Sequence, residues 1–181
     1  MPSKKPTAKW SDVKTKLVDF DRTCMLGLVQ DLYAASKDNQ AFLHTRFGLG
    51  SDLLKPYKVT IARWLWPDPY KRQNTSVANA KKAISDYKKA TGQPKELAEL
   101  MVFYCEQGAG FCRELGLQDE GYFDALARMF EQALRLSVGL PLVQRDALVK
   151  RLDEVRRISH NFGYGAGDAM DGLLDEYGIH P

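Results

Sequence analysis

Apolar residues recur every three or four positions along almost the whole chain, which is the spacing of an amphipathic helix. No segment alternates apolar and polar residues with the period of two that is typical of a strand. The pattern therefore predicts an all-α protein, a multi-helix bundle of about eight or nine helices.

Four helices are expected before the prolines at 67 and 69. Ser11 and Asp19 are the candidate N-terminal caps of helices over 11–18 and 20–35, because short polar side chains accept the unpaired N–H groups there. The next two helices are expected to begin near Asp38 and Pro56. We expect residues 1–10 to form a flexible basic arm and 11–181 a single helical domain, with a possible subdomain break at 67–75.

The remaining helices are expected to begin near residues 77, 95, 119, 141 and 166. The helix over 95–115 is apolar around most of its circumference, so it is predicted to be the central helix of the bundle. Gly108 and Gly110 each cost about 1 kcal/mol against alanine in a helix interior. They therefore predict a close helix crossing or a kink at this point.

Charge is divided unevenly along the chain. Residues 1–95 carry 18 Lys and Arg against 8 Asp and no Glu, a net charge of +10, whereas residues 96–181 carry 8 Lys and Arg against 15 Asp and Glu, a net charge of −7. The two halves are predicted either to face apart as recognition surfaces or to pack together and neutralise each other.

Several stretches resemble one known family. They are AKKAISDYKK at 80–89, AELMVFYCEQG at 98–108, DEGYF at 119–123, MFEQAL at 129–134 and NFGYG at 161–165. These stretches are similar to a family of uncharacterised bacterial all-helical proteins, a domain of unknown function. The resemblance implies an all-helical bacterial protein and implies no activity.

The chain contains no phosphate loop, dinucleotide fingerprint, metalloprotease motif, nucleophile elbow or paired-cysteine zinc pattern. The glycine-rich stretch at 163–167 does not follow a predicted strand, so it is interpreted as a corner between helices. The N-terminal residues are not typical of a secretory signal, and no apolar run is long enough to span a membrane. We therefore expect a cytoplasmic protein with no cofactor, no metal and no catalytic residues.

Basic and aromatic residues between 55 and 89 favour a nucleic-acid interface as an alternative, since cations contact phosphates and exposed rings stack on unpaired bases. Trp66 and Tyr70 are the expected free rings, because Tyr57 and Trp64 fall on the predicted buried stripe. The candidate binding residues are Arg63, Trp66, Tyr70, Lys71, Arg72, Lys81, Lys82, Lys88 and Lys89.

A second alternative is an enzyme or metal site near Glu106, Cys105 and His160, in which the histidine acts as a general base. It requires that these side chains meet in space, which spacing alone does not establish. The absence of a catalytic motif and the division of charge favour a different function. The sequence predicts a non-enzymatic interaction or scaffold protein, with a protein partner or a second copy as its target.

Overall fold

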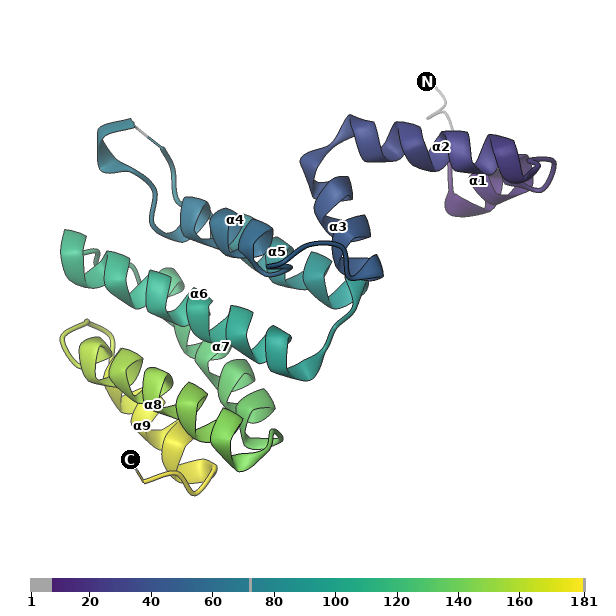
Figure 1. Cartoon of the computed structure of the whole chain (residues 1–181). Helices are drawn as coiled ribbons and strands as arrows, with labels where there is room; N and C mark the ends of the chain where they lie inside the picture. The colour runs from purple at the N-terminus through teal and green to yellow at the C-terminus, as the bar shows by residue number, and fades with distance from the viewer. Residues whose placement is uncertain (1–7, 72, 181) are drawn as a thin grey trace, which may run out of the picture.

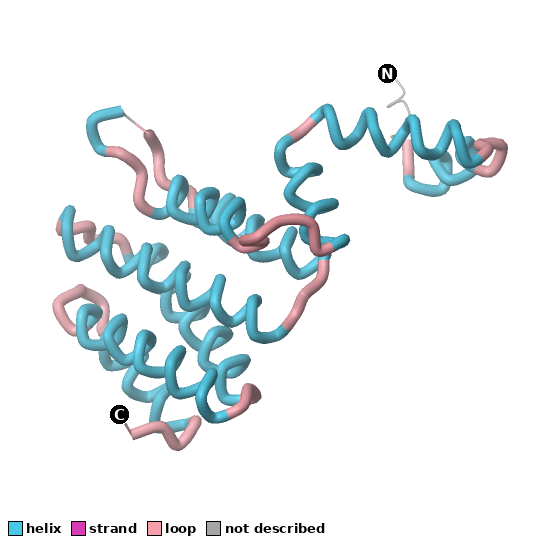
Figure 2. Tube along the Cα trace, viewed as in Figure 1, coloured by secondary structure: helices cyan, strands magenta, loops and turns pink. Residues whose placement is uncertain are grey.

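The computed structural model describes residues 8–71 and 73–180, and these residues form nine α-helices and no strand (Figures 1 and 2). The helices are α1 Trp10–Leu17, α2 Arg22–Ala35, α3 Lys37–Phe47, α4 Lys55–Leu65, α5 Val77–Ala90, α6 Pro94–Leu115, α7 Glu120–Val138, α8 Leu142–Ser159 and α9 Ala166–Glu176. A 3₁₀ turn, Pro69–Lys71, lies in the loop after α4. The predicted all-α fold class is confirmed.

The first two helices begin at different residues from those expected. The Lys9 N–H donates to the Asp12 side chain at 2.8 Å, so α1 begins at Trp10 and Ser11 is not its cap. The Cys24 N–H donates to Asp21 Oδ1 at 2.7 Å, so Asp21 caps α2. The predicted caps Ser11 and Asp19 were wrong because several polar residues here suit a helix start equally well by type.

Later helix ends follow the sequence closely. Asp119 caps α7 by accepting the Tyr122 N–H at 2.7 Å, as expected for an aspartate at this position. Gly48 and Gly92 adopt positive φ values of 65° and 63° just after α3 and α5, a backbone conformation that glycine adopts without a steric penalty. Pro56 occupies the first turn of α4.

Helix α6 lies at the centre of the bundle and packs against α4, α5, α7 and α8. Leu100, Val102 and Cys105 of this helix are completely inaccessible to solvent. Gly108 lies against α7, where a Cβ atom would be 3.2 Å from the Leu126 side chain. The expected close crossing is therefore present. Among the described residues, no helix combines the length and apolarity that crossing a membrane requires.

Helices α1 and α2 project away from this bundle (Figures 1 and 2). Neither helix contains a buried residue. Helix α3 connects them to the rest: Thr45 is buried and accepts a hydrogen bond from the Tyr57 hydroxyl of α4 at 3.2 Å, and the Arg46 guanidinium donates to the Lys89 carbonyl at the end of α5. We call residues 8–35 the helical arm and residues 37–180 the body, and a single domain over 11–181 stays a prediction.

Candidate functional site

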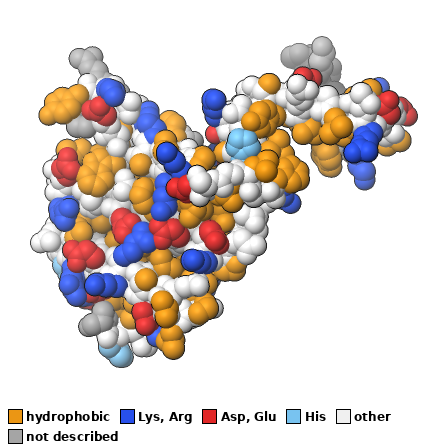
Figure 3. Space-filling model, viewed as in Figure 1, with side chains coloured by type: hydrophobic (Ala, Val, Ile, Leu, Met, Phe, Trp, Pro, Cys, Tyr) orange, Lys and Arg blue, Asp and Glu red, His pale blue; other side chains and the backbone are white. Residues whose placement is uncertain are grey.

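The helical arm exposes large apolar side chains over both of its helices (Figure 3). Trp10 is 68% exposed and Leu26 is 61% exposed. We define the arm face as the nine large apolar residues of this segment that are exposed: Trp10, Val13, Val18, Phe20, Met25, Leu26, Val29, Leu32 and Tyr33. Exposed apolar side chains that gather over one element in this way mark an interaction site more often than scattered single residues do.

The apolar stripe on α2 is already indicated by the spacing of apolar residues in the sequence. Met25, Leu28, Val29 and Leu32 recur at i, i+3, i+4 and i+7, which places them on one side of the helix. Three of the four are exposed in the structure, and Leu28 is half-buried. Helical spacing predicts that these residues share a face, but it cannot distinguish a face packed on the core from one that awaits a partner.

The corner between α2 and α3 holds the arm in a fixed direction. The Asn39 side chain donates to the Leu32 carbonyl at 2.6 Å, and the Gln40 side chain donates to the Tyr33 carbonyl at 3.1 Å. The Tyr33 hydroxyl is hydrogen-bonded to His44 Nε2 at 3.0 Å. The bonds from Asn39 and Gln40 pair carbonyl groups at the end of α2 that have no partner within their own helix. Hydrogen bonds between α2 and α3 therefore hold the arm face in place relative to α3.

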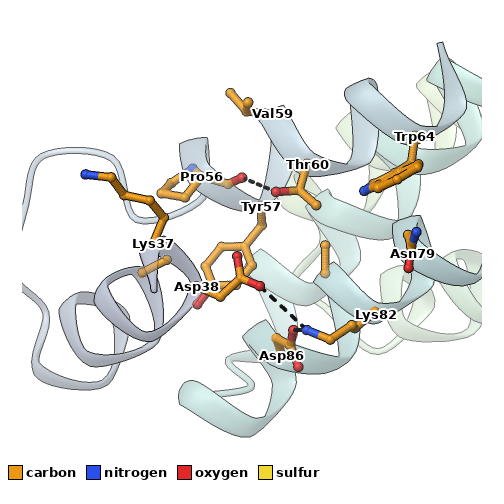
Figure 4. A pocket seen from close by; sticks show the side chains of 12 residues that line it. Lys37, Asp38, Pro56, Tyr57, Val59, Thr60, Trp64, Asn79, Lys82 and Asp86 are labelled. Carbon is orange, nitrogen blue, oxygen red and sulfur yellow. Dashed lines mark hydrogen bonds and ion pairs between the residues drawn. The ribbon is translucent and has the colours of Figure 1, made fainter. Parts of the chain in front are cut away.

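A groove of about 500 Å³ opens where α3, α4 and α5 meet (Figure 4). Asp38 of α3 faces Lys82 of α5 at 3.8 Å, and Asp86 lies 2.5 Å from the same ammonium group. The Thr60 hydroxyl donates to the Pro56 carbonyl, so it is already paired. Lys82 on the rim of the groove is therefore already paired with two carboxylates.

The structure pairs some of the predicted nucleic-acid-binding cations with carboxylates. Lys82 and Lys89 are both paired with Asp86, at 2.5 and 3.7 Å. Lys81 lies on another side of α5, where burial and the nearby Arg128 guanidinium lower the pKa of its ammonium group. Lys88 is exposed. Neighbouring carboxylates of the basic half thus already neutralise part of the positive charge.

The aromatic part of that candidate interface also differs from the expectation. Trp66, predicted to be a free ring, packs against Gly110 of α6, so that a Cβ atom at Gly110 would lie 2.2 Å from the ring. The chain leaves its helical path at Trp66, which turns the indole toward the core. Tyr70 is 95% exposed.

Two more of the predicted nucleic-acid-binding residues, Lys71 and Arg63, contact neighbouring groups of the chain. Lys71 pairs with Asp68 at 3.2 Å. The Arg63 guanidinium stacks over the ring of Trp64, 4.5 Å from its centroid, and donates to the Asn74 carbonyl. Arg72 lies outside the described residues. The nucleic-acid interface therefore stays a prediction, with part of its cations held in local contacts.

The two charged halves are joined by one network that sequence reasoning missed. Arg151 of α8 donates to both carboxylate oxygens of Glu106, at 2.7 and 2.8 Å, and to both oxygens of Glu99. Lys58 of α4 donates to Glu99 Oε1 at 2.6 Å. Among the ion pairs of residues 8–71 and 73–180, this Lys58–Glu99 pair is the one that links the basic half to the acidic half.

Charge compensation sets the ionisation of this network. Burial raises the pKa of the Glu99 carboxyl, but the hydrogen bonds and positive charges of Arg151 and Lys58 outweigh burial and hold its pKa below 4.5. The two glutamates raise the pKa of the Arg151 guanidinium further above its usual value. Because the partners lie 45 and 52 residues from Arg151 in the sequence, no local pattern indicates the network.

The proposed site near Glu106, Cys105 and His160 does not form as expected. Cys105 is completely buried, and burial raises the pKa of its thiol far above the usual value. Glu106 is held by Arg151, and it lines a pocket with Trp66 to which neither Cys105 nor His160 contributes. Cys105 is buried in the core, Glu106 is paired with Arg151 and His160 lies beside Asp171. The three side chains therefore do not form a pair of nucleophile and base.

His160 instead belongs to a cluster of charges at the corner between α8 and α9. Its Nε2 atom lies 3.1 Å from Asp171 and its Nδ1 atom 3.8 Å from Asp168, an arrangement of three groups that is compatible with a metal ion. The Arg156 guanidinium, however, donates to Asp171 at 2.8 Å and lowers the pKa of that carboxyl. The cation that a metal would supply is thus already provided by the protein, and the cluster is explained as an ion-pair network.

Comparison of the chain with protein-family models, with curated proteins and with solved structures found no match. The resemblance to a family of bacterial all-helical proteins therefore stays a prediction.

Proposed function

We propose that this chain is a non-enzymatic interaction or scaffold protein whose binding element is the helical arm. The body holds the arm at a fixed corner, and the arm face contacts a protein partner. We place this function in the cytoplasm of a bacterial cell, which agrees with the three cysteines being free thiols, one of them exposed.

The observation that carries the proposal is that an ordered pair of helices buries no residue while exposing the nine side chains of the arm face. An isolated helix shorter than about 12–15 residues is marginal in water, and helices in proteins draw most of their stability from packing of the apolar side. Helix α1 has 8 residues and α2 has 14. A partner that covers the arm face supplies the packing that the chain itself does not.

The body gives less support to a nucleic-acid partner. A nucleic-acid site needs cations that converge on phosphates and rings that are free to stack. Lys71, Lys82 and Lys89 already pair with carboxylates, and Trp66 is packed against α6. The charge of the basic half is therefore proposed to steer a protein partner toward the molecule, with the arm face providing the contact.

Photo-crosslinking in cells that express the chain tests this function. A benzoylphenylalanine residue placed at Leu26 lies on the arm face, and one placed at Gly27 is an exposed control, because Gly27 lies on the side of α2 opposite the apolar stripe and a side chain there meets no other atom within 4 Å. We expect protein adducts from position 26 and few from position 27. Equal yields at both positions, or none at position 26, would contradict the proposal whatever the identity of the adduct.

A further inference from the structure

The arm face is large enough to form a specific interface. Its nine side chains expose on the order of 700 Å² of apolar surface. A stable protein–protein interface buries about 800 Å² on each partner. The largest apolar patch of a typical monomer is about 300–600 Å². The arm alone therefore provides close to one complete half of a standard interface.

The charges of the arm are complementary to those of a second arm. Residues 9–17, which include α1, carry three Lys and one Asp, a net charge of +2. Residues 18–35, which include α2, carry one Arg and three Asp, a net charge of −2. In a two-fold arrangement, α1 of one copy meets α2 of the other, so unlike charges are placed opposite each other twice.

The same charges argue against an anionic membrane as the binding partner of the arm face. Amphipathic helices that lie on such membranes are rich in Lys and Arg on the polar side, and binding depends on that positive charge. Residues 9–35 carry four basic and four acidic residues, so the arm has no net charge with which to bind an anionic surface.

We propose that the occupant of the arm face is a second copy of this chain. The two arms pair about a two-fold axis and form a four-helix bundle, with α1 of each copy against α2 of its partner and the apolar side chains in the centre. The bodies extend outward on either side. This inference deepens the proposed function and rests on it, because it names the partner of the same surface.

Light scattering after size-exclusion chromatography tests the inference on the full chain. We expect twice the 20.4 kDa mass of one chain at micromolar concentrations. Leu26→Glu should weaken the association at least about a hundredfold, because a buried leucine is replaced by a charge. Gly27→Glu adds the same charge on the exposed side of α2 opposite the apolar stripe and should leave the dimer intact. Far-UV circular dichroism checks that the body, which excludes Leu26, stays folded in both variants.

A charge exchange distinguishes pairing of two arms from binding of an arm to the body. Lys14→Glu with Lys16→Glu makes α1 acidic, and Asp19→Lys with Asp31→Lys makes the second arm segment basic. Each double variant should dimerise less well alone, and an equimolar mixture of the two should recover association. Failure of the mixture to recover would contradict pairing of the arms.

The outcomes separate this inference from the proposed function. A monomeric wild-type chain whose arm still crosslinks to another protein at position 26 would overturn the second copy and leave the proposed function standing. Flotation of the wild-type chain, but not of Leu26→Glu, with phosphatidylglycerol vesicles would show a membrane occupant and overturn both. A monomer with neither crosslinks nor vesicle binding would also overturn both.

Discussion

Replacing Arg151 with methionine should lower the free energy of unfolding by about 2 kcal/mol at pH 7. The substitution leaves Glu99 and Glu106 without the guanidinium that now neutralises both carboxylates. Breaking a fully buried pair costs about 3–5 kcal/mol. The cost is smaller here because the three side chains are 23–34% exposed, so solvent screens their charges. Urea unfolding followed by circular dichroism gives the difference.

The same variant should show a defined dependence on pH. The folded-state pKa of Glu99 lies below its ordinary value of 4.5, so its stabilising contribution is present above pH 4.5 and is lost as the pH falls through the folded-state pKa. The gap in stability between wild type and Arg151→Met should therefore be constant near neutral pH and shrink in acid below pH 4.5.

Arg145→Met is the matched control for Arg151. Arg145 lies on the same helix, but its carboxylate partner Asp146 is 64% exposed. We expect a change within about 0.5 kcal/mol, as for surface ion pairs generally. Equal effects of the two substitutions, or a gap for Arg151→Met that persists unchanged in acid, would contradict the assigned role of the network.

Gly110→Ala should destabilise the body, whereas Gly172→Ala should stabilise it. Alanine favours a helix over glycine by about 1 kcal/mol. At Gly110 the new methyl group would lie 2.2 Å from the Trp66 ring, so Trp66 has to leave its packed position, and overpacking of this kind costs about 1–3 kcal/mol. At Gly172, inside α9, no atom lies within 4 Å of the added carbon.

The two glycine variants should consequently differ by about 2 kcal/mol, which corresponds to about 4–8 °C in the midpoint of thermal unfolding for a chain of this size. Differential scanning calorimetry of both variants against wild type measures the difference. Similar midpoints for Gly110→Ala and Gly172→Ala would show that the contact between Trp66 and α6 does not hold the loop after α4 in place.

The helical architecture was predictable because it depends on local signals. Periodic apolar residues, Asp119 as a cap and Gly48 and Gly92 as C-terminal stops act within a few residues of where they stand in the sequence. Gly108 and Gly110 likewise indicated close packing, since glycine in a helix interior is costly without it.

The features that carry function depend on contacts distant in sequence. The stripe Met25, Val29 and Leu32 looks the same in sequence whether or not another element covers it. Trp66 was expected to be free because Tyr57 and Trp64 occupy the predicted buried stripe, but the chain changes direction at Trp66 and the ring packs on α6. The Arg151 network joins residues about 50 positions apart, and spacing gives no indication of such a pair.

Amide hydrogen exchange of residues 10–35 in the full chain tests most directly whether the arm face is an interface. We expect exchange in α1 and α2 to be slow at high protein concentration and to accelerate on dilution, while exchange in α6 stays slow throughout. Arm amides that exchange freely at every concentration, or that stay equally protected in Leu26→Glu, would contradict a dimer formed through the arms.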